Sequence, residues 1–257
     1  MLILLPPSEG KSAPAKGSPV SLSSLSHPGL SDARRRVGDA LVRMSATRGA
    51  TTALGVGPSL EGEVLRNTTL WSNPSAAAAT VYTGVLYDAA QAASWDARML
   101  ARSHDRVRIM SALWGALSPM DKIPAYRLSM ATTMPRLGTL TSYWRRHLGA
   151  VLDPLAAESV VVDCRSSTYA AAWRPSDAPW VMVKVLRDRD GTRSVVSHMA
   201  KHTRGLLTAH LLTLESVPST PADVADAAAA MVGTHLVDLT LVARPNGPHE
   251  LTLIIGD

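Results

Sequence analysis

Short polar clusters follow three apolar runs of this chain, and each cluster holds residue types that bind anions. The clusters are Ser8 to Lys11, Ser111 to Asp121, and Arg165 to Tyr169. They combine hydroxyl groups, cationic side chains and glycine backbone. Several fixed cations and backbone amides suit the dispersed negative charge of a phosphate. The chemistry that these residue types favour is therefore the binding of phosphate-bearing molecules.

The first cluster is presented by the start of the chain. The unbroken apolar run from Leu2 to Leu5 predicts a strand that is buried on both faces. Pro6 and Pro7 end this strand, because proline cannot donate to a sheet ladder and favours extended geometry before it. A polar cluster just after a central strand lies where open α/β sheets place their ligands.

Two more apolar runs, Val107 to Ala112 and Ser159 to Asp163, predict buried strands of the same kind. If the three strands lie side by side, their C-terminal ends converge on one cleft. Four further residues could join this cleft: Tyr126, Arg127, Lys201 and Arg204. The cleft would then be rich in cations, with Glu9 and Asp121 as its acidic members. Gly84, beside Thr83, predicts a close backbone approach or the start of a helix.

Most standard catalytic and nucleotide-binding motifs are missing from the sequence. Neither GxxxxGK[ST] nor GxGxxG follows a predicted strand, and neither GxSxG nor HExxH occurs. Lys11 could act as a nucleophile if burial or a neighbouring cation lowered its pKa, but phosphate binding is the simpler interpretation. Cys164 is the single cysteine, so an internal disulfide and a cysteine-ligated zinc site are excluded. We expect no cofactor and no stoichiometric structural metal.

Composition narrows the class of protein. Of the 257 residues, 46% are hydrophobic, which suits a globular chain, and the net charge of +5 favours an anionic partner. The absence of Phe disfavours an aromatic platform for stacked bases. No run approaches the roughly 20 apolar residues of a membrane helix, and the early prolines argue against a signal peptide. We therefore expect a cytoplasmic protein with no membrane partner.

Periodicity and capping residues predict the other elements. Helices are expected over 31–47, 58–66, 74–80, 94–104, 199–214 and 220–233, and the segment 134–152 is expected to contain another. Hairpin strands are expected over 180–186 and 193–198, with Asp190-Gly191 as the turn, and over 236–243 and 250–255 across Pro245–Gly247. Arg34, Arg35 and Arg36 are interpreted as a solvated helix face. There is no internal repeat and no domain linker.

Several of these segments together resemble the YaaA peroxide-stress family, in order and spacing, over nearly the whole chain. The segments are Leu2–Lys11, Tyr82–Gly84, Arg108–Gly115 with Pro119–Asp121, Pro124–Leu128, Asp163–Tyr169 and Ala200–Gly205. The resemblance implies a single α/β domain over 1–257, with mixed sheet, surrounding helices and unusual topology. It also implies a helix-hairpin-helix element, for which Trp114–Arg127 is the best candidate. Trp114 stands where the family often has Tyr, and His202 where another basic residue is common.

In function, the resemblance implies a cytoplasmic protein that protects against hydrogen peroxide, limits unincorporated iron and binds DNA through a basic cleft. Binding would be mainly to the DNA backbone, without sequence preference. The alternative is an enzyme that acts on a nucleotide, nucleobase or other phosphorylated small molecule in the same cleft, and the residues leave both interpretations open. The predicted cleft residues are Ser8, Lys11, Thr83, Ser111, Tyr126, Arg127, Ser167, Tyr169, Lys201 and Arg204. The predicted supporting residues are Glu9, Gly84, Gly115 and Asp121.

Overall fold

The centre of the protein is a mixed sheet of eight strands, seen in a computed structural model that describes residues 1–244 and 247–256. The strand order is β11-β12-β9-β8-β1-β3-β4, and β10 pairs with β9. The strands are β1 (Leu2–Leu5), β3 (Val107–Ser111), β4 (Gly115–Leu117), β8 (Val161–Asp163), β9 (Trp180–Arg189), β10 (Thr192–Val195), β11 (Asp238–Val242) and β12 (His249–Ile255). Two small sheets pair β2 (Ala76–Ala77) with β5 (Lys122–Ile123) and β6 (Thr133–Met134) with β7 (Gly138–Thr139).

The three predicted central strands are neighbours. β1 lies between β3 and β8 and is parallel to both, with Leu4 opposite Arg108 on one side and Asp163 on the other. Every residue of β1 is buried, as expected for a strand covered on both faces. Because the three strands run in the same direction, their C-terminal ends meet at one edge of the sheet. The loops that carry the predicted polar clusters therefore leave the sheet side by side.

Ten helices of at least four residues surround the sheet within the described ranges. They are α1 (Ser31–Ser45), α2 (Ala50–Ala53), α3 (Glu61–Arg66), α4 (Ala78–Val81), α5 (Val85–Ala89), α6 (Ala97–Arg106), α7 (Leu140–Ala157), α8 (Ser167–Ala170), α9 (Ser197–Thr213) and α10 (Pro221–Ala229). Short 3₁₀ turns occur at Leu22–Ser24, Pro28–Leu30, Pro58–Leu60, Asn67–Thr69 and Ala92–Ser94. None of the described helices has the length and apolar character needed to cross a membrane.

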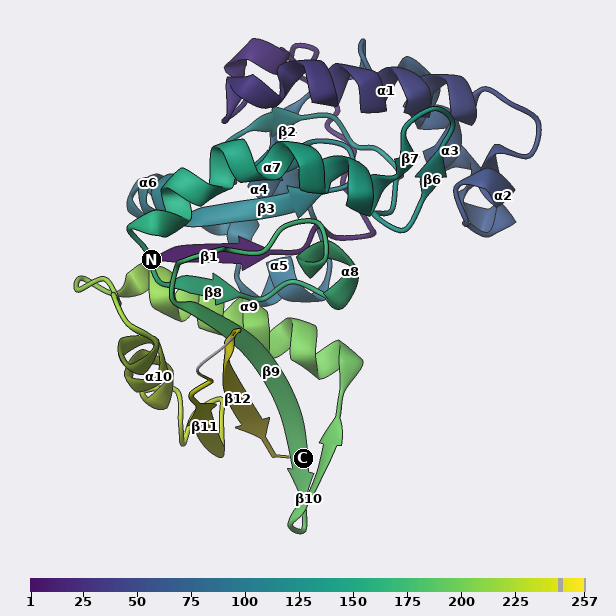
Figure 1. Ribbon diagram of the computed structural model, residues 1–257. Coiled ribbons are helices and arrows are strands. Elements are labelled where there is room, and N and C mark those ends of the chain that lie inside the picture. The colour runs from purple at the N-terminus through teal and green to yellow at the C-terminus, as the bar shows by residue number, and fades with distance from the viewer. Residues whose placement is uncertain (245–246, 257) are drawn as a thin grey trace.

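The arrangement of these helices is clear in Figure 1. α1 and α7 lie together at one end of the molecule, beyond β3, and α10 lies beside β11 near the other end. α9 runs along β9 and packs closely against α5. The α8 and α5 helices lie at the ends of β1 and β8, where the predicted cleft residues are expected.

Turn and capping signals in the sequence predicted several boundaries correctly. Asp190 and Gly191 both have positive φ, as a two-residue hairpin turn between β9 and β10 requires. Thr220 caps α10 in a capping box with Asp223. β11 and β12 pair as the predicted antiparallel hairpin. Of the turn predicted between them, Pro245 and Asn246 lie outside the described residues.

Other boundaries were predicted wrongly, because tertiary pairing overrides local propensity. The alanine-rich segment 74–80 is not one helix: Ala76 and Ala77 pair with β5, and a helix begins only at Ala78. The helix predicted within 134–152 is present as α7, but it begins only at Leu140, because Met134 pairs with Gly138 in a small hairpin, and it extends to Ala157. The strand predicted over 193–198 ends at Val195, and the helix predicted from Ser94 begins at Ala97.

The proposed helix-hairpin-helix at Trp114–Arg127 is also wrong. This segment contains β4 and β5 joined by loops, and no helix occurs anywhere within it. Gly115 has φ +74° and pairs with Ser111, and Trp114 is fully buried. Pro119 lacks the backbone donor that a helix interior needs. The segment is therefore part of the sheet and its core, and it presents no pair of helices.

Candidate functional site

A pocket of about 330 Å³ lies at the C-terminal ends of β1 and β8, and we call it the strand-end pocket. Its walls come from the loop after β1, the loop before α5, the start of α8, and one face of α9. Seven predicted residues line it: Ser8, Glu9, Thr83, Gly84, Tyr169, Lys201 and Arg204. Four segments that are distant in sequence therefore share one hollow.

The loop after β1 is held by its own hydroxyl and by its lysine. The Ser8 hydroxyl donates to the carbonyl of Gly10 and accepts a hydrogen bond of 3.0 Å from the backbone N–H of Thr83. Lys11 Nζ donates to the carbonyl oxygens of Ser8, at 2.8 Å, and Glu9, at 3.4 Å. The loop therefore has a defined shape where it borders the strand-end pocket.

Lys11 lies behind this loop and does not line the strand-end pocket itself. Its ammonium group lies 4.3 Å from the ring centroid of Tyr126 and 5.5 Å from that of Tyr82. Burial lowers the pKa of Lys11 to about 8, although the Glu9 carboxylate raises it in part. The lysine is thus a cation held by two carbonyls and two aromatic faces.

Tyr126 and Ser111 form a buried hydrogen-bond chain behind Lys11. The Tyr126 hydroxyl lies 2.9 Å from the Tyr82 hydroxyl and 2.7 Å from Ser111 Oγ. Ser111 Oγ also accepts from the backbone N–H of Trp114, at 2.9 Å. Burial raises the pKa of Tyr126 well above its usual value, and that of Tyr82 to about 12. Ser111 and Tyr126 therefore support the site from the core and do not face the pocket.

Helix α9 supplies the two cations of the strand-end pocket. Arg204 Nη2 donates to the carbonyl of Val183 at 2.8 Å, which fixes the guanidinium, and its buried Nε has no protein partner. Lys201 is exposed one turn earlier. A side chain at Gly205 would approach the carbonyl oxygen of Leu86 to 2.2 Å, so glycine is what lets α9 lie close to α5. That contact brings both cations to the rim.

Arg127, Tyr169 and Ser167 lie around the edge of the site. Arg127 bridges two carboxylates, at 3.2 Å from Glu9 Oε2 and 3.4 Å from Glu63 Oε2. Tyr169 lines the pocket, and burial raises the pKa of its hydroxyl. Ser167 is exposed on α8 and does not line the strand-end pocket.

Two of the supporting residues are structural. Asp121 accepts hydrogen bonds from the backbone N–H of Ser26, at 2.8 Å, and of Ser118, at 2.9 Å. A side chain on Gly115 would meet the ring of Trp144 at 2.6 Å. Gly84 does border the pocket, and its φ of +100° favours glycine. Asp121 and Gly115 therefore hold the fold together away from the pocket.

Sequence reasoning missed Ser166 and Tyr87, which also line the strand-end pocket. Tyr87 donates to the carbonyl of Pro6 at 2.7 Å and fixes the exit of β1. Ser166 stands next to the predicted Ser167, and α8 turns it toward the pocket in place of its neighbour. The predicted solvated face of α1 was wrong for Arg34, which is fully buried and donates to Trp114 and Ala116 carbonyls. Its helical position faces the core.

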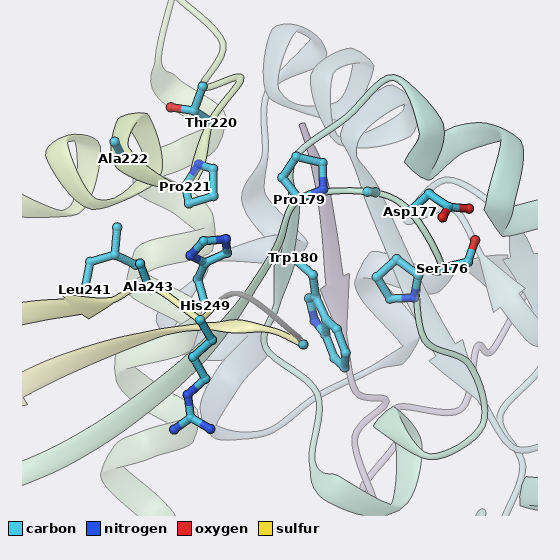
Figure 2. Close-up of a pocket in the computed structure, with 14 residues that line it drawn as sticks. Ser176, Asp177, Pro179, Trp180, Thr220, Pro221, Ala222, Leu241, Ala243 and His249 are labelled. Atoms are coloured by element: carbon cyan, nitrogen blue, oxygen red, sulfur yellow. The ribbon is translucent and has the colours of Figure 1, made fainter.

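A larger cavity of about 620 Å³ lies elsewhere, between the loop before β9, α10 and the β11–β12 pair. Figure 2 shows Trp180 and Pro179 on one side of it, and His249 and Pro221 on the other. Among its described lining residues there is none of the predicted cleft set. Its arginine, Arg244, lies 3.3 Å from Glu250. Size alone therefore does not select the functional site.

Redox and metal chemistry have few candidates among the described residues. No group of three or more His, Cys, Asp or Glu in the described part of the chain is placed to hold a metal ion. The thiol of Cys164 is buried, and burial raises its pKa to about 12. A thiol with such a pKa forms little of the thiolate that reacts with peroxide.

Comparison with known proteins identifies relatives along the whole chain. A family model described as "Peroxide stress protein YaaA" matches residues 1–230. A UPF0246 protein of Streptomyces coelicolor is 43% identical over 232 residues, which cover 88% of each chain. A UPF0246 protein of Corynebacterium efficiens is 39% identical over 257 residues, covering 99% of this chain and 100% of the relative. All residues of the strand-end pocket fall inside the matched range.

Proposed function

This chain belongs to the YaaA family of peroxide stress proteins, and from that membership we propose that its strand-end pocket binds a phosphorylated, nucleotide-like molecule in the peroxide stress response. A cytoplasmic location is part of the same proposal. Direct thiol chemistry with peroxide is disfavoured, since burial raises the pKa of the single cysteine, Cys164, to about 12. The protein would therefore contribute to peroxide resistance by binding this molecule and not by reacting with peroxide through its thiol.

One observation carries this proposal: Lys201 and Arg204 share a pocket with Ser8, Thr83 and Tyr169. The Arg204 guanidinium is held by the Val183 carbonyl and lines the pocket, where its charge suits a phosphate oxygen. Hydroxyls from separate loops suit a sugar or a base edge. A volume of about 330 Å³ is in the range of small-molecule sites.

A second candidate function is binding of duplex DNA along its phosphate backbone. The net charge of +5 and the exposed Lys201 favour it, because excess cations attract nucleic acid without sequence preference. The loss of the predicted helix-hairpin-helix removes one expected means of contact. DNA binding therefore rests on charge alone, whereas the nucleotide-like ligand is also supported by the shape of the pocket.

Calorimetric titration with adenosine diphosphate, inorganic pyrophosphate and a short duplex tests both candidates. We expect the small phosphates to bind, and replacement Lys201→Ala with Arg204→Ala to weaken them about 100-fold, because two charge-assisted contacts are lost. The matched control removes two exposed charges from another face, Arg43→Ala with Arg48→Ala, and should change affinity by less than about twofold.

The outcomes separate the candidates. Binding of small phosphates that depends on Lys201 and Arg204 supports the pocket. Binding of the duplex alone, with a steep loss between about 50 mM and about 200 mM salt, favours the DNA candidate instead. If neither the small phosphates nor the duplex binds the wild-type chain, both candidates are rejected.

A further inference from the structure

The loop after β1 turns its carbonyl groups toward the protein. The Ser8 and Glu9 carbonyls both accept from Lys11 Nζ, and the Glu9 carbonyl also accepts from Arg127, at 3.1 Å. The Gly10 carbonyl accepts from the Ser8 hydroxyl and, at 3.5 Å, from the backbone of Thr83. The Ser8 and Glu9 carbonyls are therefore directed at cations behind the loop, and the Gly10 carbonyl at a hydroxyl within the loop and at Thr83.

This arrangement decides where the adjoining amides point. In a trans peptide the C=O and the following N–H point in opposite directions. The N–H groups of Glu9 and Gly10 therefore point away from Lys11 and Tyr126. Within the described residues, neither amide has a hydrogen-bond partner. Both residues are exposed and line the strand-end pocket.

We propose that the Ser8–Gly10 loop is an anion-binding loop whose Glu9 and Gly10 amides hold a tetrahedral oxyanion, the phosphoryl group of the pocket's ligand. This deepens the proposed function and rests on it. Consecutive backbone amides form concave sites that bind phosphate. Lys11 and Arg127 act as positioning residues, because they hold the carbonyls on the far side without lining the amide face.

The one opposing charge in the loop is paired with Arg127, which also contacts Glu63. The Glu9 carboxylate lies 3.2 Å from Arg127, on the same side as the carbonyls that this arginine and Lys11 hold. Pro6 and Pro7 restrict the backbone before the loop, so little conformational freedom is left to lose on binding. The oxyanion would therefore meet two preorganised amides together with the cations of α9, across a pocket wide enough for one phosphoryl-bearing molecule.

Nuclear magnetic resonance of the full chain labelled with ¹⁵N-glycine tests this loop directly. The Gly10 amide is identified by its loss in Gly10→Ala, a substitution with ordinary contacts, the nearest being Thr83 Oγ1 at 3.4 Å. Titration with inorganic pyrophosphate should move the Gly10 amide proton downfield, as a new charge-assisted hydrogen bond does. The Gly62 amide, on α3 and outside the strand-end pocket, serves as the internal reference and should not move.

The results distinguish the anion-binding loop from the proposed binding of a phosphorylated molecule in the strand-end pocket. Calorimetric binding that depends on Lys201 and Arg204, with the Gly10 amide unmoved at saturation, overturns the anion-binding loop and leaves the pocket intact. An absence of any binding heat and any shift overturns both. A saturable Gly10 shift whose midpoint equals the calorimetric dissociation constant supports both.

Variants at Lys11 test the positioning role. Lys11→Met should weaken pyrophosphate about tenfold by freeing the carbonyls to turn, while Lys11→Arg should restore most of the affinity. If Lys11 acted only through its charge and did not position the carbonyls, the Gly10 shift at saturation would be the same in Lys11→Met as in the wild type. Because the wild-type Gly10 measurement needs no substitution at Lys11, the inference stays testable even if Lys11→Met folds poorly.

Discussion

Two groups of polar residues gather at the ends of β1, β3 and β8, and they differ in what they face. Ser8, Thr83, Lys201 and Arg204 face the strand-end pocket. A second group faces protein on every side: Ser111 bonds Tyr126, Asp121 bonds backbone amides, and Asp163 bonds Arg165. The two groups come from different motifs of the chain, so one motif directs its polar residues at the pocket and another directs them at the core.

The difference lies in what surrounds each group, which is protein for the one and an open pocket for the other. The buried group has its hydrogen-bond partners supplied by the chain, as buried polar groups need. Asp163 illustrates this, since its oxygens accept from Arg165 at 2.7 Å and from the Trp180 indole at 3.2 Å. In the pocket group, Lys201 is exposed and has no ion-pair partner among the described residues. An exposed charge without a partner is available to a ligand, whereas buried and paired groups stabilise the fold.

The largest effect should come from breaking the buried ion pair. Arg165→Ala leaves the Asp163 carboxylate buried without its partner, and we expect the free energy of unfolding to fall by about 3–5 kcal/mol. Urea denaturation measures this directly. Arg193→Ala is the matched control, because it removes an arginine from an exposed pair with Asp188 and should cost less than about 1 kcal/mol.

The variants of the pocket residues should behave differently in the same urea denaturation experiment. Lys201→Ala with Arg204→Ala should change the free energy of unfolding far less than Arg165→Ala, because Lys201 is exposed and the Arg204 side chain donates one hydrogen bond, to the Val183 carbonyl. A loss of stability in that double variant as large as in Arg165→Ala would show that the two groups are not separate.

Substitution of Gly205 should affect both stability and binding, because this residue lies at the contact between α9 and α5. Alanine there places its Cβ 2.2 Å from the Leu86 carbonyl and 2.9 Å from Ala89 Cβ, so α9 must move away from α5. We expect a loss of about 1–3 kcal/mol in stability together with weaker phosphate binding, since α9 carries both cations. Gly62→Ala, which meets nothing within 4 Å, should be neutral or slightly stabilising. Unchanged binding in Gly205→Ala would mean that the α5–α9 contact does not position the site.

Much of the fold was predictable, because the signals were local. The run Leu2–Leu5 with its following prolines predicted a buried strand and its end, and Asp190-Gly191 predicted a hairpin. The parallel neighbours of β1 followed from the same apolar patterning. The predictions failed where distant partners decide: Ala76 pairs with Ile123, which no local periodicity reveals, and Trp114–Arg127 lacks the predicted helices because it pairs with β3 and fills the core.

The sequence predicted which residues belong to the candidate site, but it did not predict which of their side chains line the pocket. Composition and order indicated that Lys11, Ser111 and Lys201 belong together, yet only coordinates separate Lys201 in the pocket from Lys11 and Ser111 behind it. Sequence patterns report residue type and spacing, whereas the direction of a side chain depends on the packing of its element. The carbonyl orientation in the Ser8–Gly10 loop is of the same kind, since donors distant in sequence such as Arg127 and Thr83 help to fix it.

A weak pH dependence of anion binding should arise from Lys11, which is buried behind the loop that borders the strand-end pocket. Burial lowers the pKa of Lys11 to about 8, so its charge is present below that pH and is lost as the pH rises through it. The groups that face Lys11 are Glu9, Glu63, Arg127, Tyr82 and Tyr126. Burial raises the pKa of both tyrosines, that of Tyr82 to about 12, so neither ionises between pH 7 and pH 9.

Inorganic sulfate suits this test, because its own charge is constant between pH 7 and pH 9. We expect its affinity, measured by calorimetry, to fall severalfold across this range as Lys11 becomes neutral and donates more weakly to the Ser8 and Glu9 carbonyls. In Lys11→Met the profile should be flat over the same range. A wild-type profile as flat as that of Lys11→Met would mean that the buried group behind the loop exerts no control over the pocket in front of it.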